Sequence, residues 1–169
     1  TASGQPQSPR ASALLAEAQE STGDRVGALD TYARATAAAA SSKEKALGLL
    51  GQGRLLVADG KWEEARGRLE QALDVGDGAV ASEAAYRLAE GLRATGRTQD
   101  AADMYMTAAY LASDSPWARK ALIGAGQAFT ALKQNDSAVI VYRKLLATTG
   151  VEPDLADTAR KALRSLGAG

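Results

Sequence analysis

The sequence predicts an all-α solenoid, a stack of helical hairpins in which each hairpin packs on the next. In four places a turn residue is followed five positions later by an alanine, at Ala28, Ala65, Ala101 and Ala138. These alanines are 37, 36 and 37 residues apart, a period typical of stacked helix-turn-helix repeats. Alanine is also the commonest residue and aromatic residues make up only 5% of the chain, a composition that favours helices packed at short distance.

The chain is predicted to contain four hairpins and a closing helix. Residues 1–10 are polar and rich in turn formers, which predicts a linker or frayed start ahead of a repeat domain over residues 11–169. The hairpins are expected at residues 11–40, 41–76, 77–113 and 114–150. Within them, the second helix of the first hairpin is predicted to run to Ala40.

Specific signals mark two helix starts and the last helix. Ser41 and Glu44 have the spacing of a capping box. Ser115 followed by Pro116 combines a capping residue with proline at the first helical position. An amphipathic helix is predicted over residues 153–166. Because stacked repeats expose an apolar face at each end, we interpret this single helix as a cap.

Composition argues against several classes of function. Twenty basic and twenty acidic residues balance, so no net field attracts nucleic acid or an anionic membrane. Histidine and cysteine are both absent, which removes the commonest general base, the commonest metal ligand and all thiol chemistry. No apolar run approaches the roughly 18 residues needed to span a bilayer, so membrane insertion of this segment is not expected. We predict a protein that is not an enzyme and carries no cofactor or metal.

Three local motifs have structural interpretations that we prefer. The glycines of residues 48–53 superficially resemble a phosphate-binding loop, but they are predicted to lie inside a helix rather than between a strand and a helix. Residues 74–78 hint at a calcium loop, but the closing glutamate is missing. Trp62 and Trp117 begin helices and are interpreted as packing anchors.

These residues resemble the tetratricopeptide repeat family. Its pattern has a small residue at the eighth position of each repeat and an aromatic residue or leucine at the twenty-fourth. Here the eighth positions are Ala16, Gly53, Ala89 and Gly126, and the twenty-fourth are Tyr32, Leu69, Tyr105 and Tyr142. The pattern is broken at Leu145, where alanine is usual, and at Lys133, which replaces the turn glycine. The resemblance implies a right-handed α–α superhelix in which small residues let helices cross closely and each ring wedges into the next hairpin.

The resemblance also implies that the first helix of each hairpin lines a concave groove for a peptide or partner domain. The implied groove residues are Leu50, Arg54, Val57, Tyr86, Glu90, Arg93, Ile123, Gln127 and Thr130, with Arg87 at the rim and Leu47, Glu83 and Lys120 in equivalent positions. Leu50, Tyr86 and Ile123 would be apolar anchors, and the arginines could bind a carboxylate. The alternative is that Leu50 and Ile123 only pack inside the fold.

Two further expectations concern context. The long period and the single closing helix resemble bacterial cell-envelope members of the family, in particular periplasmic proteins that accompany the Tol-Pal system. That likeness implies a periplasmic or envelope location and a place within a larger envelope protein, with the cytoplasm as the alternative. The second function hypothesis is structural self-association through the N-terminal hairpin, where Ala37–Ala40 offers a flat surface of small residues.

Overall fold

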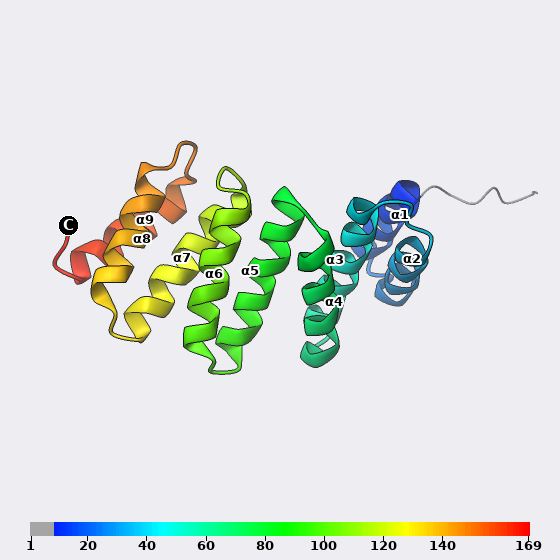
Figure 1. Ribbon diagram of the computed structural model, residues 1–169, viewed down its shortest axis with the longest axis horizontal. Helices are drawn as coiled ribbons and strands as arrows, with labels where there is room; N and C mark the ends of the chain where they lie inside the picture. The colour runs from blue at the N-terminus through cyan, green and yellow to red at the C-terminus, as the bar shows by residue number, and fades with distance from the viewer. Residues whose placement is uncertain (1–8) are drawn as a thin grey trace, which may run out of the picture. The chain divides into compact units, whose positions relative to one another are not determined.

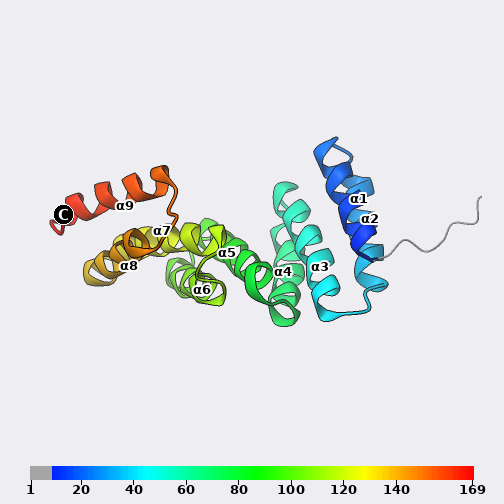
Figure 2. The same ribbon diagram turned by 90° about the horizontal axis from the view of Figure 1, so that it is seen from above.

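The computed structural model describes residues 9–169, which are helical with short connections and contain no strand (Figure 1 and Figure 2). The helices are α1 (Pro9–Ser21), α2 (Arg25–Ala37), α3 (Ser42–Ala58), α4 (Trp62–Val75), α5 (Gly78–Ala94), α6 (Thr98–Leu111), α7 (Pro116–Ala131), α8 (Asn135–Ala147) and α9 (Pro153–Ser165). This order confirms the predicted fold class. The predicted linker lies largely outside the described residues, and α1 begins two residues earlier than the expected start of the repeat domain. No helix in the described range is long and apolar enough to cross a membrane.

The helices form two compact units. The first unit ends at Ala81 and the second begins at Ser82, so the boundary falls inside α5. In the first unit, α3 packs against α1, α2 and α4. In the second unit, α7 packs against α6, α8 and α9, and the Ser82 hydroxyl of α5 donates a 2.8 Å hydrogen bond to the Ala108 carbonyl of α6. Each unit therefore has its own set of packed helices.

Both predicted capping serines are confirmed. Ser41 Oγ accepts a 3.2 Å hydrogen bond from the Glu44 N–H, and Ser115 Oγ accepts one of 3.0 Å from the Ala118 N–H. Each bond satisfies a backbone donor that has no partner within its own helix. The Glu44 carboxylate accepts from the Ala40 N–H at 3.0 Å, one residue before the cap.

The same contact explains one wrong prediction. Helix α2 ends at Ala37, with Ala38 as its C-cap, rather than continuing to Ala40. Because Glu44 binds the Ala40 N–H and Ser41 is extended as the cap of α3, residues 38–40 are drawn out of the helix. Of the run Ala37–Ala40, only Ala37 therefore lies in α2. Self-association through this flat surface of small residues stays a prediction.

The turns inside the hairpins share a left-handed residue. Gly23, Gly60 and Gly96 have φ values of 85°, 74° and 80°, a region that glycine enters without steric cost. Lys133 occupies the equivalent position of the fourth hairpin with φ 60°. The fourth turn thus keeps the geometry of the other three, although for a residue with a Cβ this conformation costs about 1–2 kcal/mol.

Aromatic rings packed on glycines set the spacing between hairpins. Tyr32 is 2% exposed and packs on Gly51, and Tyr105 is fully buried and packs on Gly124. In both pairs the ring belongs to one hairpin and the glycine to the next, as the wedge interpretation predicted. A Cβ placed on Gly124 would lie 2.5 Å from the Tyr105 ring, far inside van der Waals contact. Leu69 and Tyr142 pack in a similar way on Gly53 and Gly126 of their own hairpins.

Helix α9 is tied to α7 by a two-pronged ion pair. Arg119 of α7 donates to both carboxylate oxygens of Glu152, at 2.9 and 3.0 Å, and Glu152 is the N-cap residue of α9. The Arg119 side chain is only 12% exposed. These hydrogen bonds lower the pKa of Glu152 from 4.5 to about 2, because they favour its ionised form.

This pair predicts acid sensitivity that is specific to Glu152. A depressed pKa contributes stability that is complete above pH 4.5 and is lost as the pH falls toward about 2. We expect Glu152→Gln to lower the melting temperature at pH 7, and the difference from wild type to shrink over that pH range. Thermal unfolding followed by circular dichroism between pH 7 and pH 2 measures this difference in melting temperature.

Asp157→Asn is the matched control for this experiment. Asp157 also pairs with an arginine, Arg160, but both side chains are more than half exposed, so its removal should change the melting temperature little. A deficit of Glu152→Gln that is as large at pH 2 as at pH 7 would contradict the role given to this ion pair.

Candidate functional site

The predicted groove residues divide between the two units. Leu50, Arg54 and Val57 lie on α3 in the first unit. Those from Tyr86 to Thr130 lie on α5 and α7 in the second unit.

In the first unit, Arg54 is part of a hydrogen-bonded cluster. Its guanidinium donates to the Glu20 carboxylate at 2.6 Å and to the Tyr32 hydroxyl at 3.1 Å. Burial raises the pKa of Tyr32 to about 12. The positive charge of Arg54 lowers this pKa and the negative charge of Glu20 raises it. The phenol therefore stays neutral at physiological pH. Arg54 therefore links α1, α2 and α3, a contact that any ligand carboxylate would have to displace.

The other two residues of this set differ in exposure. Leu50 is 5% exposed and belongs to the buried core, which favours the alternative that this side chain packs. Val57 is 41% exposed and remains open to solvent on α3. Of the three α3 residues, only Val57 is freely accessible.

In the second unit, a similar cluster holds Glu90 and Arg93. The Tyr105 hydroxyl donates a hydrogen bond to the Glu90 carboxylate, and Arg93 donates to the same hydroxyl at 3.3 Å and to Glu90 at 3.2 Å. Burial, together with the negative charge and hydrogen bond of Glu90, holds the pKa of Tyr105 well above its usual value. The polar end of a buried core tyrosine thus fixes two predicted groove residues.

The centre of this face is an aromatic and cationic cluster across α5 and α7. The rings of Tyr86 and Trp117 lie 5.5 Å apart between centroids at a tilt of 41°. The Arg87 guanidinium is 5.0 Å and the Lys120 amine 4.6 Å from the centre of the Trp117 ring, within cation–π range. Tyr86 and Trp117 are both half-buried. The rings are held by neighbours yet still offer surface.

The two cations of this cluster differ in how their charge is compensated. Arg87 pairs with Glu83, one turn earlier on α5, at 2.6 Å. Glu83 is only 8% exposed, and the pair is largely withdrawn from solvent. Lys120 is exposed and has no ion-pair partner within the described part of the chain. Lys120 is therefore the cation available to a ligand.

The predicted residues of α7 also separate into packed and accessible ones. Ile123 is 9% exposed and buried, which favours the packing alternative for this residue too. Gln127 and Thr130 are exposed, although the Thr130 hydroxyl donates to the Gly126 carbonyl at 2.8 Å. The residues of this face that a ligand can reach include Tyr86, Trp117, Lys120 and Gln127.

Sequence reasoning placed Trp117 only as a packing anchor. Its contacts with Tyr86, Arg87 and Lys120 make it part of the candidate surface. A signal was present in the sequence, because residues 117 and 120 are three apart and therefore share one face of a helix. Pairing Trp117 with Tyr86 needed the packing of α5 against α7, which spacing alone does not provide.

The glycine-rich stretch is confirmed as a packing feature. Gly48, Gly51 and Gly53 lie inside α3, and a Cβ on any of them would collide with Thr36, Tyr32 or Leu69. No group of three or more metal-binding side chains occurs among residues 9–169.

Comparison with known proteins identifies the type of repeat. A sequence profile of the tetratricopeptide repeat matches residues 50–116 and 92–153. No curated protein matches the sequence significantly.

Several solved structures share the fold. One is the crystal structure of YrrB, a TPR protein with an unusual peptide-binding site, with a TM-score of 0.66 and 18% identity over 93% of this chain and 77% of that one. Another is a Podosopora anserina chain of nearly identical TPR-like repeats assigned as a kinesin light chain, with a TM-score of 0.69 and 17% identity over 96% and 90%. The Cut9–Hcn1 hetero-tetramer of the APC/C gives a TM-score of 0.70 at 14% identity over 92% of this chain and 30% of that one. At these identities the likeness concerns the fold, and it gives no support to the Tol-Pal part of the resemblance.

Proposed function

The chain belongs to the tetratricopeptide repeat family, and we propose that it is a non-catalytic scaffold that binds a peptide or partner domain on the α5–α7 face of its second unit. The observation that carries the proposal is the cluster of Tyr86 and Trp117 beside the unpaired cation of Lys120. Half-buried aromatic residues with a neighbouring cation are typical of the residues that dominate binding energy in protein interfaces.

The cluster indicates which ligand groups would be recognised. The rings of Tyr86 and Trp117 suit an apolar side chain, because they are already ordered and little side-chain entropy is lost on binding. Lys120 can bind a carboxylate, and exposed Gln127 can hydrogen-bond a peptide backbone. Arg93 is half exposed and could add a contact without leaving Tyr105. A peptide with an apolar residue beside an acidic one fits this surface.

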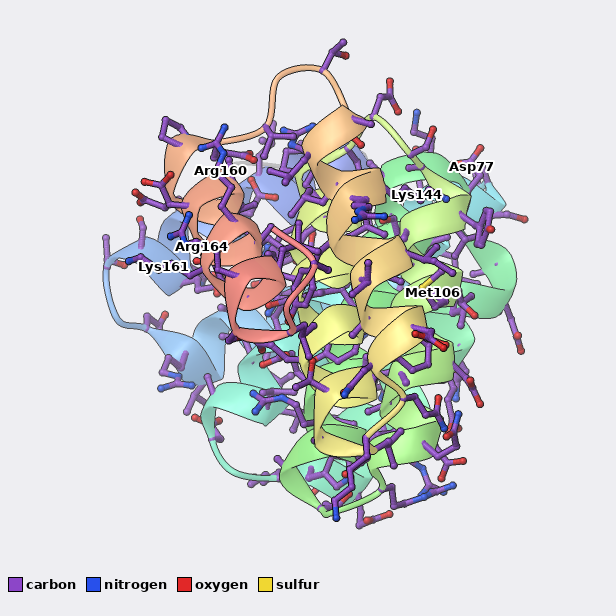
Figure 3. The ribbon with its side chains drawn as sticks, turned by 90° about the vertical axis from the view of Figure 1, so that its left-hand side faces the viewer. Asp77, Met106, Lys144, Arg160, Lys161 and Arg164 are labelled. Carbon is purple, nitrogen blue, oxygen red and sulfur yellow. The ribbon has the colours of Figure 1, made fainter. Side chains whose placement is uncertain are left out.

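The test compares capture of partners by wild type and two charge-matched variants. Lys120→Glu reverses the free cation beside Trp117, and Lys161→Glu makes the same change on the exposed face of α9 (Figure 3). Each variant, checked for folding by circular dichroism, is used to capture proteins from the source cells. We expect Lys120→Glu to weaken capture of the specific partner by about tenfold or more, equivalent to about 1.4 kcal/mol, and Lys161→Glu to leave it unchanged.

A fluorescence measurement then places the contact. The chain has two tryptophans, so Trp62→Phe leaves Trp117 as the single reporter, in the proposed surface. A peptide from the captured partner should change the emission of this variant on titration. A partner bound equally by both lysine variants, without any change in Trp117 emission, would exclude the α5–α7 face. Recovery of only the protein itself, together with an apparent molecular mass from light scattering that grows with concentration, would favour self-association.

The envelope location remains part of the proposal, resting only on the long repeat period and the closing helix. Fractionation of source cells with an antibody to this chain tests it independently of binding.

A further inference from the structure

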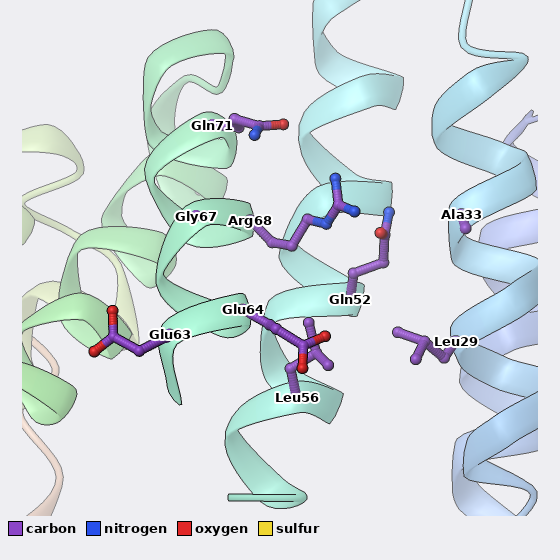
Figure 4. Close-up of a pocket in the computed structure, with 9 residues that line it drawn as sticks. All are labelled: Leu29, Ala33, Gln52, Leu56, Glu63, Glu64, Gly67, Arg68 and Gln71. Carbon is purple, nitrogen blue, oxygen red and sulfur yellow. The ribbon is translucent and has the colours of Figure 1, made fainter. Parts of the chain in front are cut away.

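The first unit contains an open groove on the side of α3 that faces α2 and α4. Its volume is about 550 Å³, and α2 and α4 pack against α3 but not against each other. In Figure 4, Glu64 and Arg68 of α4 point toward α2, and Leu29 of α2 points back toward α4. The groove is also lined by Leu56, Gln52, Ala33 and Gly67.

The second unit has the same register but different side chains at the matching positions. Ala28 corresponds to Ala101 and Ala65 to Ala138, a shift of 73 residues in both cases. By the same shift, Met106 corresponds to Ala33 and Ile140 corresponds to Gly67.

Another pair of matching positions makes a contact between two helices in the second unit. The shift also matches Tyr110 to Ala37 and Lys144 to Gln71. In the second unit, the amine of Lys144 (labelled in Figure 3) lies 4.2 Å from the centre of the Tyr110 ring and so links α8 to α6. Tyr110 and Ile140 are 71% and 67% exposed, so these positions lie at the surface of the second unit. In the first unit the matching residues are alanine and glycine, and an open groove lies between α2 and α4.

Among residues 9–169, Gly67 has no packing role. It lies in the middle of α4, and a Cβ placed on it would meet no atom within 4 Å. The glycines of α3, in contrast, are each pressed against a neighbouring side chain. Glycine in a helix interior lowers helix stability, and at Gly67 it leaves this part of the groove wall without a side chain.

The charged groups of the groove are not satisfied by the chain itself. Glu64 and Arg68 are four residues apart on α4, a spacing that favours an ion pair. Within the described residues, however, neither forms an ion pair with the other or with a third residue. Glu63, which also lines the groove, pairs instead with Arg66 at 3.5 Å.

Gln52 adds an acceptor at the base of the groove. Its side chain is only 4% exposed, and its amide nitrogen donates to Thr36 at 2.9 Å and to the Gly48 carbonyl at 3.3 Å. Its Oε1 has no hydrogen-bond partner among residues 9–169. An N–H from a bound segment would satisfy this oxygen.

We propose that this groove docks a peptide segment of a partner protein that carries a bulky aliphatic side chain and, about one helical turn away, a carboxylate. The aliphatic side chain enters between Ala33 and Gly67 and packs on Leu29 and Leu56, which line the same groove. The carboxylate binds the guanidinium of Arg68, which can donate two parallel hydrogen bonds. Because Glu64 would repel it, the acidic end of the segment lies toward the C-terminal end of α4. This site is independent of the α5–α7 face.

The test is a selection of random twelve-residue peptides displayed on phage, using the full 169-residue chain as bait. The filled variant Ala33→Met/Gly67→Ile, which copies the second unit, is the counter-selection. We expect wild type to enrich peptides that combine Ile, Leu or Met with Asp or Glu. These peptides should bind the filled variant about tenfold or more weakly. Asp157→Asn, a change on α9 outside both proposed binding surfaces, should leave their binding intact.

A charge exchange gives a second measurement that does not depend on filling the groove. Arg68→Glu should shift the selected peptides from acidic to basic residues while keeping the aliphatic one. Circular dichroism verifies the fold of each variant. Failure to enrich any peptide that distinguishes wild type from both variants would overturn the proposal. So would peptides that keep their acidic preference on Arg68→Glu.

Discussion

Replacing Tyr105 by alanine is expected to lower the free energy of unfolding of the second unit by about 3–5 kcal/mol, the usual cost of removing a buried aromatic side chain. Tyr105 is fully buried and packs on Gly124, and its ring lies 5.9 Å from that of Tyr86. Its removal would leave a cavity at the junction of two hairpins. Denaturant unfolding followed through Trp117 fluorescence in a Trp62→Phe background measures the change.

Tyr105→Phe is the control for that experiment. It keeps the ring and removes only the hydroxyl that donates to Glu90 and accepts from Arg93. Its cost should therefore be smaller, about 1 kcal/mol. Equal losses for the two variants would mean that the hydrogen bonds, and not the packing of the ring, give Tyr105 its importance.

Gly124→Ala and Gly67→Ala should have opposite effects, although both put alanine into the interior of a helix. The intrinsic helix preference favours alanine in both cases by about 1 kcal/mol. At Gly67 the new methyl meets no atom, so a net stabilisation of about 1 kcal/mol is expected. At Gly124 the methyl would lie 2.5 Å from a buried, rigid ring, and overpacking costs about 1–3 kcal/mol or more. After the gain in helix preference is subtracted, we expect a net loss of up to about 2 kcal/mol.

The comparison of these two variants isolates packing, because the chemical change is identical. Chemical denaturation of both proteins under one set of conditions is sufficient. Stabilisation by Gly124→Ala would show that the ring relaxes away from the helix at little cost, and that glycine is not required for the hairpins to approach.

Much of the fold could be predicted because local signals agreed with the repeat period. The cap at Ser115, the turn at Gly96 and the wedge of Tyr105 each stand where a stacked hairpin needs them, and the structure confirms all three. The end of α2 could not be predicted, because alanine favours helix at every position from 37 to 40. What stops that helix is the capping of the next one by Ser41 and Glu44. Local preference did not reveal this competition.

The candidate site was harder to predict, because position in a repeat does not determine exposure. Leu50 and Tyr86 occupy equivalent positions, yet Leu50 is buried and Tyr86 is half exposed beside Trp117. Likewise, Arg54 stands in an equivalent position to Glu90, and both are held by a tyrosine hydroxyl from the second helix of a hairpin. Those tyrosines were recognised as core residues only, since a repeat pattern describes where a ring packs and not what its hydroxyl contacts.

The buried apolar residues of both units are mostly alanines, and this has a thermal consequence. An alanine methyl removes far less hydrocarbon from water than a leucine or phenylalanine side chain does. The heat capacity increment of unfolding, which grows with the apolar area exposed, should therefore be small for a chain of this length. A small increment flattens the curve of free energy against temperature. The resistance of this protein to unfolding should thus vary little over a broad range of temperatures, with cold denaturation moved further below freezing.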